Sequence, residues 1–566
     1  MNTLLLSQAL AQPSPKRARL RGVRPGAAPP TTPEESPAWD ERSLRQLVRT
    51  RLSGAQIIVV SNRQPHSHHR QGGHGGQVRI EQAASGLVTA IEPVVRACGG
   101  SWIAHGSGNA DRDHVDATDS WTTSPASGQY RLRRVWLSAE QQRGHGDGLS
   151  NSGLWPLCHL THVRPLFRQP DWQHYVEVNR LFADAVLHEA QQPDPVLLVQ
   201  DYHLALLPAM VRQRLPQATV LSFWHIPWTH PAQMSQCPWL AELVDGLLGS
   251  DVVGFQTARH ADHFFASARG LGRAVKRNLG PFQTGRCRVS AVRDYAISIA
   301  WPGARAASAA RVWSASMAPG APAAPRLAPL SPGWRQSAAQ RWGVPAEAKL
   351  IVGVDRLDPS KGLIERLHAV EALLQQQPQW QGRLRFVQVA APTRTGVAGY
   401  AELHAQVRAE VQRINARFGV GRCPPILLLD QHHDRDSLDL LYRAADLCLV
   451  TSLHDGMNLV CKEFVAARDD EQGVLVLSQF AGAAHELTQA LVVNPYHIIQ
   501  VAQAMHQGLA MPAAEQAQRM RALRDTVKSN NVFRWGARML LDAASVRDGR
   551  AGFGLAGRRL HSAGRP

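Results

Sequence analysis

The chain has 566 residues, of which 44% are hydrophobic and 19% charged, and its formal net charge is +17. This length and composition suit two or three globular domains with a large apolar core, and they exclude a chain that is disordered throughout. No stretch reaches the roughly 18 uninterrupted apolar residues of a membrane helix, so we expect a cytoplasmic protein without a membrane partner.

The positive charge is concentrated in three segments, which together carry 14 of the 17 net charges: residues 1–54, 302–342 and 546–566. They are rich in small residues, Pro and Arg, a composition that cannot bury enough apolar surface to fold. We predict a disordered basic N-terminal segment over 1–54, helical only at 44–52, a Pro/Ala-rich linker or insertion over 302–342, and a disordered basic tail over 546–566. Nonspecific binding of polyanions is the alternative to simple solvation, and a nucleic acid partner is not expected.

Short apolar runs bounded by polar residues predict buried strands in the first half of the chain. They lie at residues 55–63, 195–203, 218–227, 251–257 and 296–302. Helical stretches such as 172–191 separate them. This alternation predicts a parallel sheet covered by helices on both faces, in a domain over residues 55–301.

A second series of strands and helices follows, and it predicts another domain of the same kind over residues 343–545. Its strands are expected at 349–358, 383–392, 424–433, 446–456, 473–482 and 490–495. The fold class is therefore α/β, with two doubly wound Rossmann-like domains facing each other across a cleft. Polar residues gather just after the strands of both domains, which is where open α/β sheets bind ligands.

The segment VDRLDPSKG places Arg356 and Lys361 five residues apart after a strand. Two fixed cations there suit a diphosphate leaving group, because Arg provides a bidentate fork and Lys a point charge. The alternative is a pair of ordinary surface charges.

The segment SLHDGMNLVCKEF places Asp455 and Gly456 where a strand gives way to a helix. The free N–H groups of Gly456, Met457, Asn458 and Leu459 would face an anion, and Glu463 one turn later could hold a sugar diol. Read as structure alone, Asp455 is a helix cap and Glu463 a solvated residue.

Residues 72–76 form a glycine-rich run that lacks the order of a nucleotide-binding loop, and we interpret it as a flexible loop. The nearby His66, His68, His69 and His74 have no carboxylate or thiolate at ligand spacing. We therefore expect no metal site there and no metal or other cofactor in the protein.

Ten short motifs between residues 61 and 496 resemble those of trehalose-6-phosphate synthases, a family of retaining glycosyltransferases with the GT-B fold. The most specific are DGMNLVCKEF (455–464) and SQFAGAAHEL (478–487), supported by SNR, LWP, QDYH, HIPW, GFQT, VDRLDPSKG, APTR and NPY. The resemblance covers roughly residues 55–545. It implies transfer of glucose from UDP-glucose to glucose 6-phosphate, without a metal, giving α,α-trehalose 6-phosphate and UDP.

The resemblance also implies roles for individual residues. Arg356 and Lys361 would clamp the donor diphosphate, Glu463 would hold the ribose, and the backbone from Gly456 to Leu459 would line the donor pocket. Gly86 would belong to the glycine loop that closes over the donor phosphates. Asp455 and His225 would contact the transferred glucose. For the acceptor, Arg63 and Arg394 would hold the phosphate, and Asp201 and Trp155 the sugar.

Several residues depart from the family pattern. Gly146 stands where the family has a tyrosine that helps to bind the acceptor phosphate, with His145 as a conceivable substitute, and His105, Ala300 and His454 also differ. Three hypotheses therefore stand: the synthase, a glucosyltransferase for another phosphorylated acceptor such as glycerol 3-phosphate, and a catalytically degenerate regulatory homologue. The sequence leaves open whether copies of the chain form a homo-oligomer.

Overall fold

The computed structural model describes residues 39–71, 76–82, 86–123, 129–277, 289–301, 342–345, 348–394, 398–420 and 424–562, with side chains up to residue 550. These residues belong to one compact unit. The predicted linker, apart from Trp342, lies outside them, as do His74 and most of the glycine-rich run.

The first half of the chain forms a nine-stranded sheet in which every pair of strands is parallel except β5 and β6. In spatial order the strands are β10 (Val275–Lys276), β11 (Ser290–Asp294), β9 (Val252–Phe255), β8 (Thr219–Trp224), β7 (Val196–Gln200), β1 (Ile57–Arg63), β4 (Ser101–His105), β6 (Arg131–Val135) and β5 (Ser120–Thr122). In the central register, Ile58 of β1 lies between Ser101 of β4 and Leu197 of β7. An antiparallel hairpin, β2 (His66–Arg70) and β3 (Val78–Gln82), follows β1.

The second half forms a six-stranded, fully parallel sheet, and all six strands predicted for it are present. In spatial order they are β14 (Ile426–Leu429), β13 (Leu384–Ala391), β12 (Lys349–Arg356), β15 (Leu447–Val450), β16 (Val474–Ser478) and β17 (Leu491–Val493).

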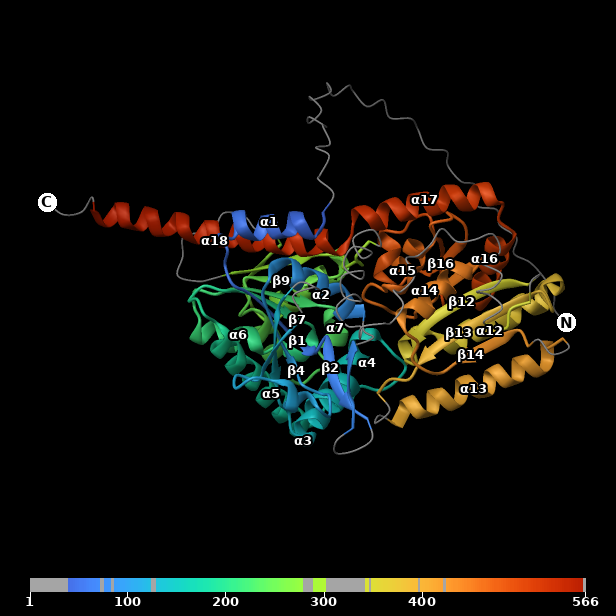
Figure 1. Ribbon diagram of the computed structural model, residues 1–566, viewed down its shortest axis with the longest axis horizontal. Coiled ribbons are helices and arrows are strands. Elements are labelled where there is room, and N and C mark those ends of the chain that lie inside the picture. Colours follow the sequence, from blue (N-terminus) through green and yellow to red (C-terminus); the bar gives the residue numbers. More distant parts are fainter. Residues whose placement is uncertain are drawn as a thin grey trace, which may run out of the picture. The chain divides into compact units, whose positions relative to one another are not determined.

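Helices connect the strands in both halves (Figure 1). In the first half they are α1 (Glu41–Arg51), α2 (Gly86–Cys98), η1 (Asp111–His114), α3 (Ala139–Gln141), the π-helix η3 (Gln142–Leu154), α4 (Trp155–His159), α5 (Gln169–Glu189), η4 (Tyr202–Leu204), α6 (Leu207–Arg214), α7 (Pro231–Met234), α8 (Leu240–Leu247) and α9 (Ala258–Gly270). In the second half they are η5 (Pro359–Lys361), α12 (Leu363–Gln376), η6 (Pro378–Trp380), α13 (Ala398–Phe418), α14 (Arg435–Ala444), α15 (Val460–Ala467), η7 (Gly482–His485), α16 (Ile498–Ala510), α17 (Ala513–Ser529) and α18 (Val532–Ser562).

Strand β1 shows why the predicted strands are continuous apolar runs. Its side chains alternate between two separate cores: Val59 packs in the cluster that includes α2, and Val60 packs with Val186 of α5 on the other face. A strand with helices on both faces has no polar side, so its sequence does not alternate. The prediction of two doubly wound Rossmann-like sheets is confirmed.

The strand predicted at 296–302 is wrong. Residues 296–301 are buried but belong to no strand, and the edge strand is β11, a few residues earlier. The backbone of this run is satisfied by groups distant in the sequence: the amide of Ile297 donates to Gln256, its carbonyl accepts from Lys462, and the carbonyl of Ile299 accepts from the amide of Val532. The apolar run is therefore a buried passage that needs no strand partner.

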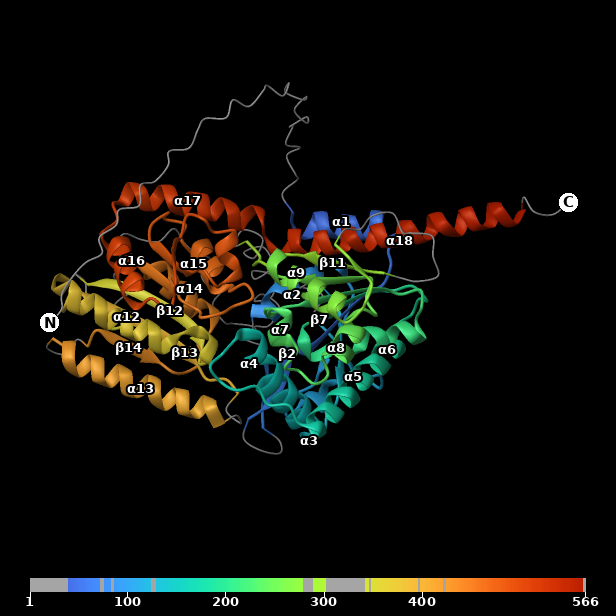
Figure 2. The same cartoon turned by 180° about the vertical axis from the view of Figure 1, so that it is seen from behind.

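The ends of the described chain also differ from the predicted disordered segments. Helix α1, expected at 44–52, buries Leu44, Leu47 and Val48, and α18 continues to Ser562 beside α1 (Figure 2). Two arginines assigned to the solvated tail are paired instead: Arg547 with Asp194 at 2.6 Å and Arg550 with Asp251 at 2.5 Å. The composition of residues 546–566 therefore did not reveal a helix, which the first half of the chain holds in place.

A search of the described helices for a stretch long and apolar enough to span a bilayer finds none.

Candidate active site

The predicted site residues lie at the carboxyl ends of strands in both sheets. Arg63 is the last residue of β1 and Arg356 the last of β12, while Asp201 and His225 directly follow β7 and β8. Ligands of open parallel sheets bind at this edge because successive strand ends converge there. Contacts described below join residues of the two halves at this edge.

Lys361 and Asp455 form the closest ion pair of the site. The Lys361 Nζ lies 2.5 Å from Asp455 Oδ2, which also accepts hydrogen bonds from Asn458 Nδ2 at 3.1 Å and Ser452 Oγ at 3.2 Å. Burial alone would raise the pKa of Asp455, but the charge and hydrogen bond of Lys361 lower it to about 2. Asp455 is therefore a carboxylate, and the positive charge of Lys361 is held in place.

The segment after Asp455 lies directly against the first half of the chain. A Cβ added to Gly456 would lie 2.4 Å from the carbonyl oxygen of His225, so only glycine fits there. Helix α15 begins at Val460, and within the described part of the chain the backbone N–H groups of residues 456–459 donate to no other group. The N–H groups before the helix are thus free in the described chain, as the sequence predicted, and their role in binding an anion stays a prediction.

The other residues of this segment form its walls. The side chain of Met457 is buried in the core, and Leu459 is half-buried. A Cβ on Gly86, the first residue of α2, would meet Leu459 Cδ1 at 3.4 Å. The structure thus brings Gly86 to the predicted donor pocket.

Two arginines lie over the ring of Trp155, and a third lies near them. The guanidinium carbon of Arg394 lies 3.8 Å from the centre of the Trp155 ring and that of Arg356 lies 4.9 Å from it. Arg63 is close to both: loss of hydration lowers its pKa, and the charges of Arg356 and Arg394 lower it further, although part of the side chain is open to solvent. In the described part of the chain, neither Arg63 nor Arg356 forms an ion pair.

Arg394 is anchored by residues that the sequence analysis did not single out. It donates to Asp358 Oδ2 at 2.9 Å and to the Tyr400 hydroxyl, and the indole Nε1 of Trp155 donates to the other oxygen of Asp358 at 3.3 Å. Asp358 is fully buried, and the charges of Arg394 and Arg356 hold its pKa well below the usual range against the effect of burial. Asp358 lies inside the VDRLDPSKG motif, so an acidic residue within that motif was the sequence signal that could have identified it.

Asp201 and His225 lie side by side beneath this group. Asp201 Oδ1 accepts from the amide of His225 at 3.2 Å, and His225 Nε2 lies 2.8 Å from Gln200 Oε1. Burial raises the pKa of Asp201 to about 6 and lowers that of His225 to about 3. His225 is therefore neutral at physiological pH, and Asp201 titrates at a pH slightly below the physiological value.

Glu463 is the predicted site residue with the weakest link to the others. It lies on the first turn of α15, 3.5 Å from the Tyr442 hydroxyl and 3.6 Å from Arg435, both on α14. Its role in holding a ribose stays a prediction.

Three residues of the site have a left-handed backbone conformation. Asp201, Arg394 and Asn458 have positive φ angles of 75°, 50° and 74°. Non-glycine residues in this region cost of order 1–3 kcal/mol each and persist where the surrounding structure imposes them, most often at functional sites.

The comparisons with known proteins agree with this geometry. The model of glycosyltransferase family 20 matches residues 55–312 and 333–545. The chain belongs to glycosyltransferase family 20. A trehalose-6-phosphate synthase of Mycolicibacterium vanbaalenii is 37% identical over 513 residues, covering 88% of this chain and 97% of the relative.

Solved structures of the family have the same fold. An E. coli protein bound with UDP-2-fluoro glucose matches with a TM-score of 0.72 and 33% identity, over 87% of this chain and 99% of that one. A UDP-forming α,α-trehalose-phosphate synthase of Burkholderia xenovorans, in complex with glucose-6-phosphate, matches with a TM-score of 0.71 and 30% identity, over 86% of this chain and 100% of that one. The fold class is therefore GT-B, as the resemblance implied.

The structure shows where the departures from the family 20 pattern lie. A Cβ on Gly146 would meet no atom within 4 Å, so the position is open. His145 is buried, stacks on Tyr175 and has its Nε2 3.0 Å from the carbonyl of His203, so it does not take the place of the missing tyrosine. His105 and His454 are lowered in pKa by burial, and each has one buried ring nitrogen without a hydrogen bond.

The hairpin histidines are engaged in hydrogen bonds. His66 Nε2 lies 2.8 Å from Glu92, and the amide of His68 donates to Asp111 at 2.7 Å. The described residues contain no group of three or more His, Cys, Asp or Glu that could hold a metal ion. That the protein works without a metal stays a prediction.

Proposed function

We propose that this chain is a retaining glucosyltransferase that transfers glucose from UDP-glucose to glucose 6-phosphate and releases α,α-trehalose 6-phosphate and UDP. One observation carries the proposal: at one edge of the two Rossmann-like sheets, Lys361 paired with Asp455 and a group of three arginines supply four cations, enough for a donor diphosphate and an acceptor phosphate. The relatives named as trehalose-6-phosphate synthases, and the family structures with UDP-2-fluoro glucose and glucose-6-phosphate, support these substrates.

The donor diphosphate binds to Lys361, Arg356 and the N–H groups of residues 456–459. When the bond between the anomeric carbon and the phosphate oxygen breaks, negative charge develops on the diphosphate. Fixed cations and the positive end of α15 stabilise that charge more in the transition state than in the ground state, which is what lowers the barrier. These groups supply the positive charge of the site, so the proposal includes no metal or other cofactor.

The acceptor phosphate binds to Arg63 and Arg394, and its sugar lies against Trp155 and Asp201. These contacts orient the acceptor, so that its reacting hydroxyl faces the anomeric carbon from the side of the leaving phosphate. Orientation of this kind can contribute several kcal/mol to catalysis.

The proton of the acceptor hydroxyl passes to the departing phosphate oxygen while the new carbon–oxygen bond forms on the same face. This front-face path retains the anomeric configuration without a covalent enzyme intermediate. Asp455 is already engaged by Lys361, Asn458 and Ser452, and it orients the transferred glucose together with the neutral His225.

A second candidate function rests on the open space at Gly146. An acceptor wall that lacks the family tyrosine suits another phosphorylated acceptor, such as glycerol 3-phosphate, with the same donor half. The regulatory homologue is the third reading, and the intact Lys361–Asp455 pair counts against it. The cytoplasmic location expected from the sequence stays a prediction.

The experiment is UDP release from UDP-glucose by the purified protein with glucose 6-phosphate, with glycerol 3-phosphate and without acceptor. Release only with glucose 6-phosphate, accompanied by a nonreducing disaccharide phosphate, supports the synthase. Release with glycerol 3-phosphate moves the function to the second candidate. UDP binding in calorimetry without release under any condition favours the regulatory homologue.

A further inference from the structure

Two arginines of the site, Arg63 and Arg356, end the central strands of their sheets, and each adjoins a buried network of the same composition. In the first half Gln64, Arg134 and Asp111 bond to one another; in the second half Arg366 bonds to both Gln388 and Asp355. All six side chains are buried. Gln64 follows Arg63 in the chain, and Asp355 precedes Arg356.

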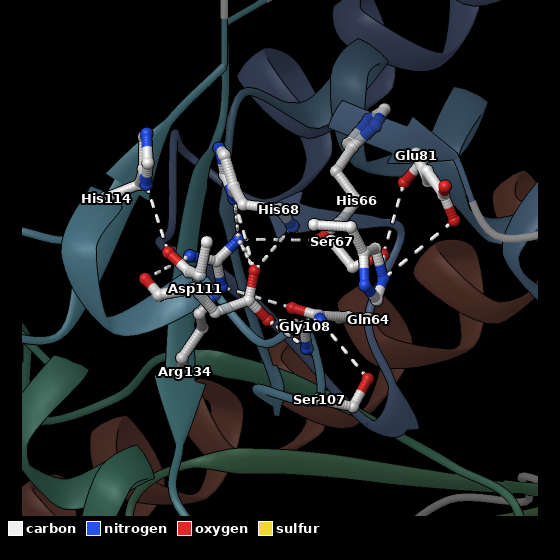
Figure 3. A network of polar contacts seen from close by, with 12 residues as sticks. Gln64, His66, Ser67, His68, Glu81, Ser107, Gly108, Asp111, His114 and Arg134 are labelled. Carbon is white, nitrogen blue, oxygen red and sulfur yellow. Dashed lines mark hydrogen bonds and ion pairs between the residues drawn. The ribbon is translucent and has the colours of Figure 1, made fainter. Parts of the chain in front are cut away.

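The first network joins segments that lie around the end of β1 (Figure 3). Asp111 accepts from Gln64 Nε2 at 2.6 Å, from the amides of His68 and Gly108 at 2.7 Å, and from Arg134 at 3.0 Å. Arg134 Nε in turn donates to Gln64 Oε1 at 3.1 Å. Both ends of the Gln64 amide are therefore fixed.

The backbone of Arg63 is held from the other side as well. Its carbonyl accepts from Ser61 Oγ at 2.8 Å, and the same hydroxyl accepts from the indole of Trp102 at 2.8 Å. The strand register shifts between Ser61 and Arg63, and Arg63 pairs with His105 of β4 beyond the shift. Side-chain hydrogen bonds on both sides therefore reinforce the backbone at an irregular point of the sheet.

The second network is centred on Arg366 of α12. Its Nη1 donates to Asp355 Oδ2 at 2.5 Å and to Gln388 Oε1 at 2.8 Å, and its Nη2 lies 3.3 Å from the carbonyl of Lys361. Gly353 on β12 makes room for it, because a Cβ there would lie 2.6 Å from Gln388 and 2.7 Å from Arg366. Arg366 thus contacts the chain at both predicted donor cations, Arg356 and Lys361.

Stability alone does not explain these networks. A buried ion pair gains no more, on average, than well-packed apolar residues of the same volume, while removal of one partner is costly. What such a network does supply is a single geometry. Arg63 and Arg356 need one, because their like charges and that of Arg394 repel each other, and the main chain must hold them in place against that repulsion.

We propose that each network positions a different set of cations. Gln64, with Arg134 and Asp111, positions Arg63 for the acceptor phosphate. Gln388, with Arg366 and Asp355, positions Arg356 and Lys361 for the donor diphosphate. The inference rests on the proposed function, which assigns those ligands to those cations. Neither glutamine touches a substrate; each acts through its neighbour.

The test is a crossed comparison of Gln64→Met and Gln388→Met, two substitutions that keep the volume but remove the hydrogen bonds. We expect Gln64→Met to raise the KM for glucose 6-phosphate about tenfold and to leave UDP affinity in calorimetry within twofold. We expect Gln388→Met to weaken UDP affinity about tenfold and to leave the KM for glucose 6-phosphate within twofold. Each variant is the matched control of the other, because both break the same kind of buried network, and their melting temperatures should fall by similar amounts.

Equal losses of both affinities in both variants would overturn the inference and leave the networks a purely structural role. Should a methionine variant fail to fold, Gln64→Asn and Gln388→Asn provide milder versions of the same comparison.

Arg63→Ala separates this inference from the proposed function. An unchanged acceptor KM in Arg63→Ala removes the assigned role of Arg63 itself, whereas a raised KM there, with no effect of Gln64→Met, overturns only the positioning role.

A double-mutant cycle adds the final distinction. If Gln64 acts through Arg63, then Gln64→Met has no further effect on acceptor kcat/KM in the Arg63→Ala background. Additive losses in the double variant would show that Gln64 acts by another route.

Discussion

The two phosphate-facing regions of the site differ in how their charge is balanced. At Lys361 the positive charge has a buried carboxylate partner, Asp455, 2.5 Å away. Around Trp155, Arg63 and Arg356 have no ion-pair partner in the described chain, and Arg394 has one, Asp358. The first region is close to neutral within the protein, whereas the second carries an excess of positive charge.

Because their charge balance differs, the two regions should contribute unequally to stability and to binding. Removal of a cation from the balanced region leaves a buried charge behind, so it should damage the protein even without substrate. Removal of Arg63 or Arg356, which form no ion pair in the described chain, relieves repulsion, so its cost should appear only when an anionic ligand binds.

Lys361→Ala should have the largest effect and should reduce both stability and activity. Asp455 would keep its buried charge without the cation that compensates it, at a cost of about 3–5 kcal/mol in unfolding free energy. The rate should fall on the order of 1,000-fold with the loss of leaving-group stabilisation. Denaturant unfolding and UDP release measure the two losses, and Lys349→Ala, which breaks the exposed pair with Asp446, is the control. An active enzyme of normal stability would contradict the balance described here.

Arg356→Ala should reduce kcat/KM about 100-fold and weaken UDP binding without lowering the melting temperature. The guanidinium has no buried carboxylate partner, and its charge is close enough to Arg63 to lower the pKa of that side chain. Calorimetry with UDP decides which region it serves, with Arg383→Ala, an exposed arginine of the same half, as the control. Unchanged UDP affinity with a raised acceptor KM would place Arg356 in the acceptor region instead.

Arg394→Ala should raise the acceptor KM about 30-fold while donor binding is preserved. One charge-assisted contact to phosphate contributes about 1.5–3 kcal/mol, and Asp358 keeps the hydrogen bonds of Ser360, Trp155 and Tyr400. Initial rates over both substrate concentrations give the two constants. Arg408→Ala, which breaks a surface pair with Asp430, is the control. Equal losses for donor and acceptor would show that Arg394 is wrongly assigned.

Gly146→Tyr should lower the acceptor KM about fivefold, because it adds a contact in the acceptor region alone. The position is open to a side chain, and one added hydrogen bond to phosphate contributes about 1 kcal/mol. The same substitution should leave UDP affinity unchanged. A higher acceptor KM would mean that the space is needed, as the second candidate function requires.

Asp201→Asn should change the pH dependence of the acceptor reaction by a few fold. The raised pKa of about 6 means that Asp201 is charged above pH 6 and becomes neutral as the pH falls through 6. The ratio of wild-type to variant kcat/KM for glucose 6-phosphate should therefore decline toward one on acidification. The phosphate also titrates near pH 6, but it does so equally for both proteins, so the ratio isolates Asp201. A ratio independent of pH would show that Asp201 does not titrate in this range.

The sequence predicted much of the fold because its strands are buried on both faces. Runs such as KLIVGV and VLVLS are apolar without alternation, and every strand predicted in the second half was found. The same signal failed at 296–302, where the run is buried without a strand partner. Strands β4 and β6 gave no such signal, since β6 reads RLRRV and its Arg134 is buried in an ion pair.

The site was predictable where short motifs carry it, as at Lys361, Asp455 and Gly456. Its supporting contacts were not, because they join residues far apart in the chain: 70 positions separate Gln64 from Arg134. No local pattern specifies such a pair, and only the register of the sheet brings it together. The same holds for Tyr400 and Arg394, whose shared carboxylate, Asp358, lies more than 30 residues earlier.

Helix α18 makes the two halves of this chain inseparable by a single cut. It begins after the second sheet is complete, yet its side chains contact the first half. Asp542 contacts Tyr295 and Arg293, and Arg547 and Arg550 reach Asp194 and Asp251. A fragment that ended before α18 would expose the apolar face that α1 and α2 present to it. Helix α18 is thus a piece of the first half that is synthesised after the second half, so the first half cannot complete its fold until the second half has been made.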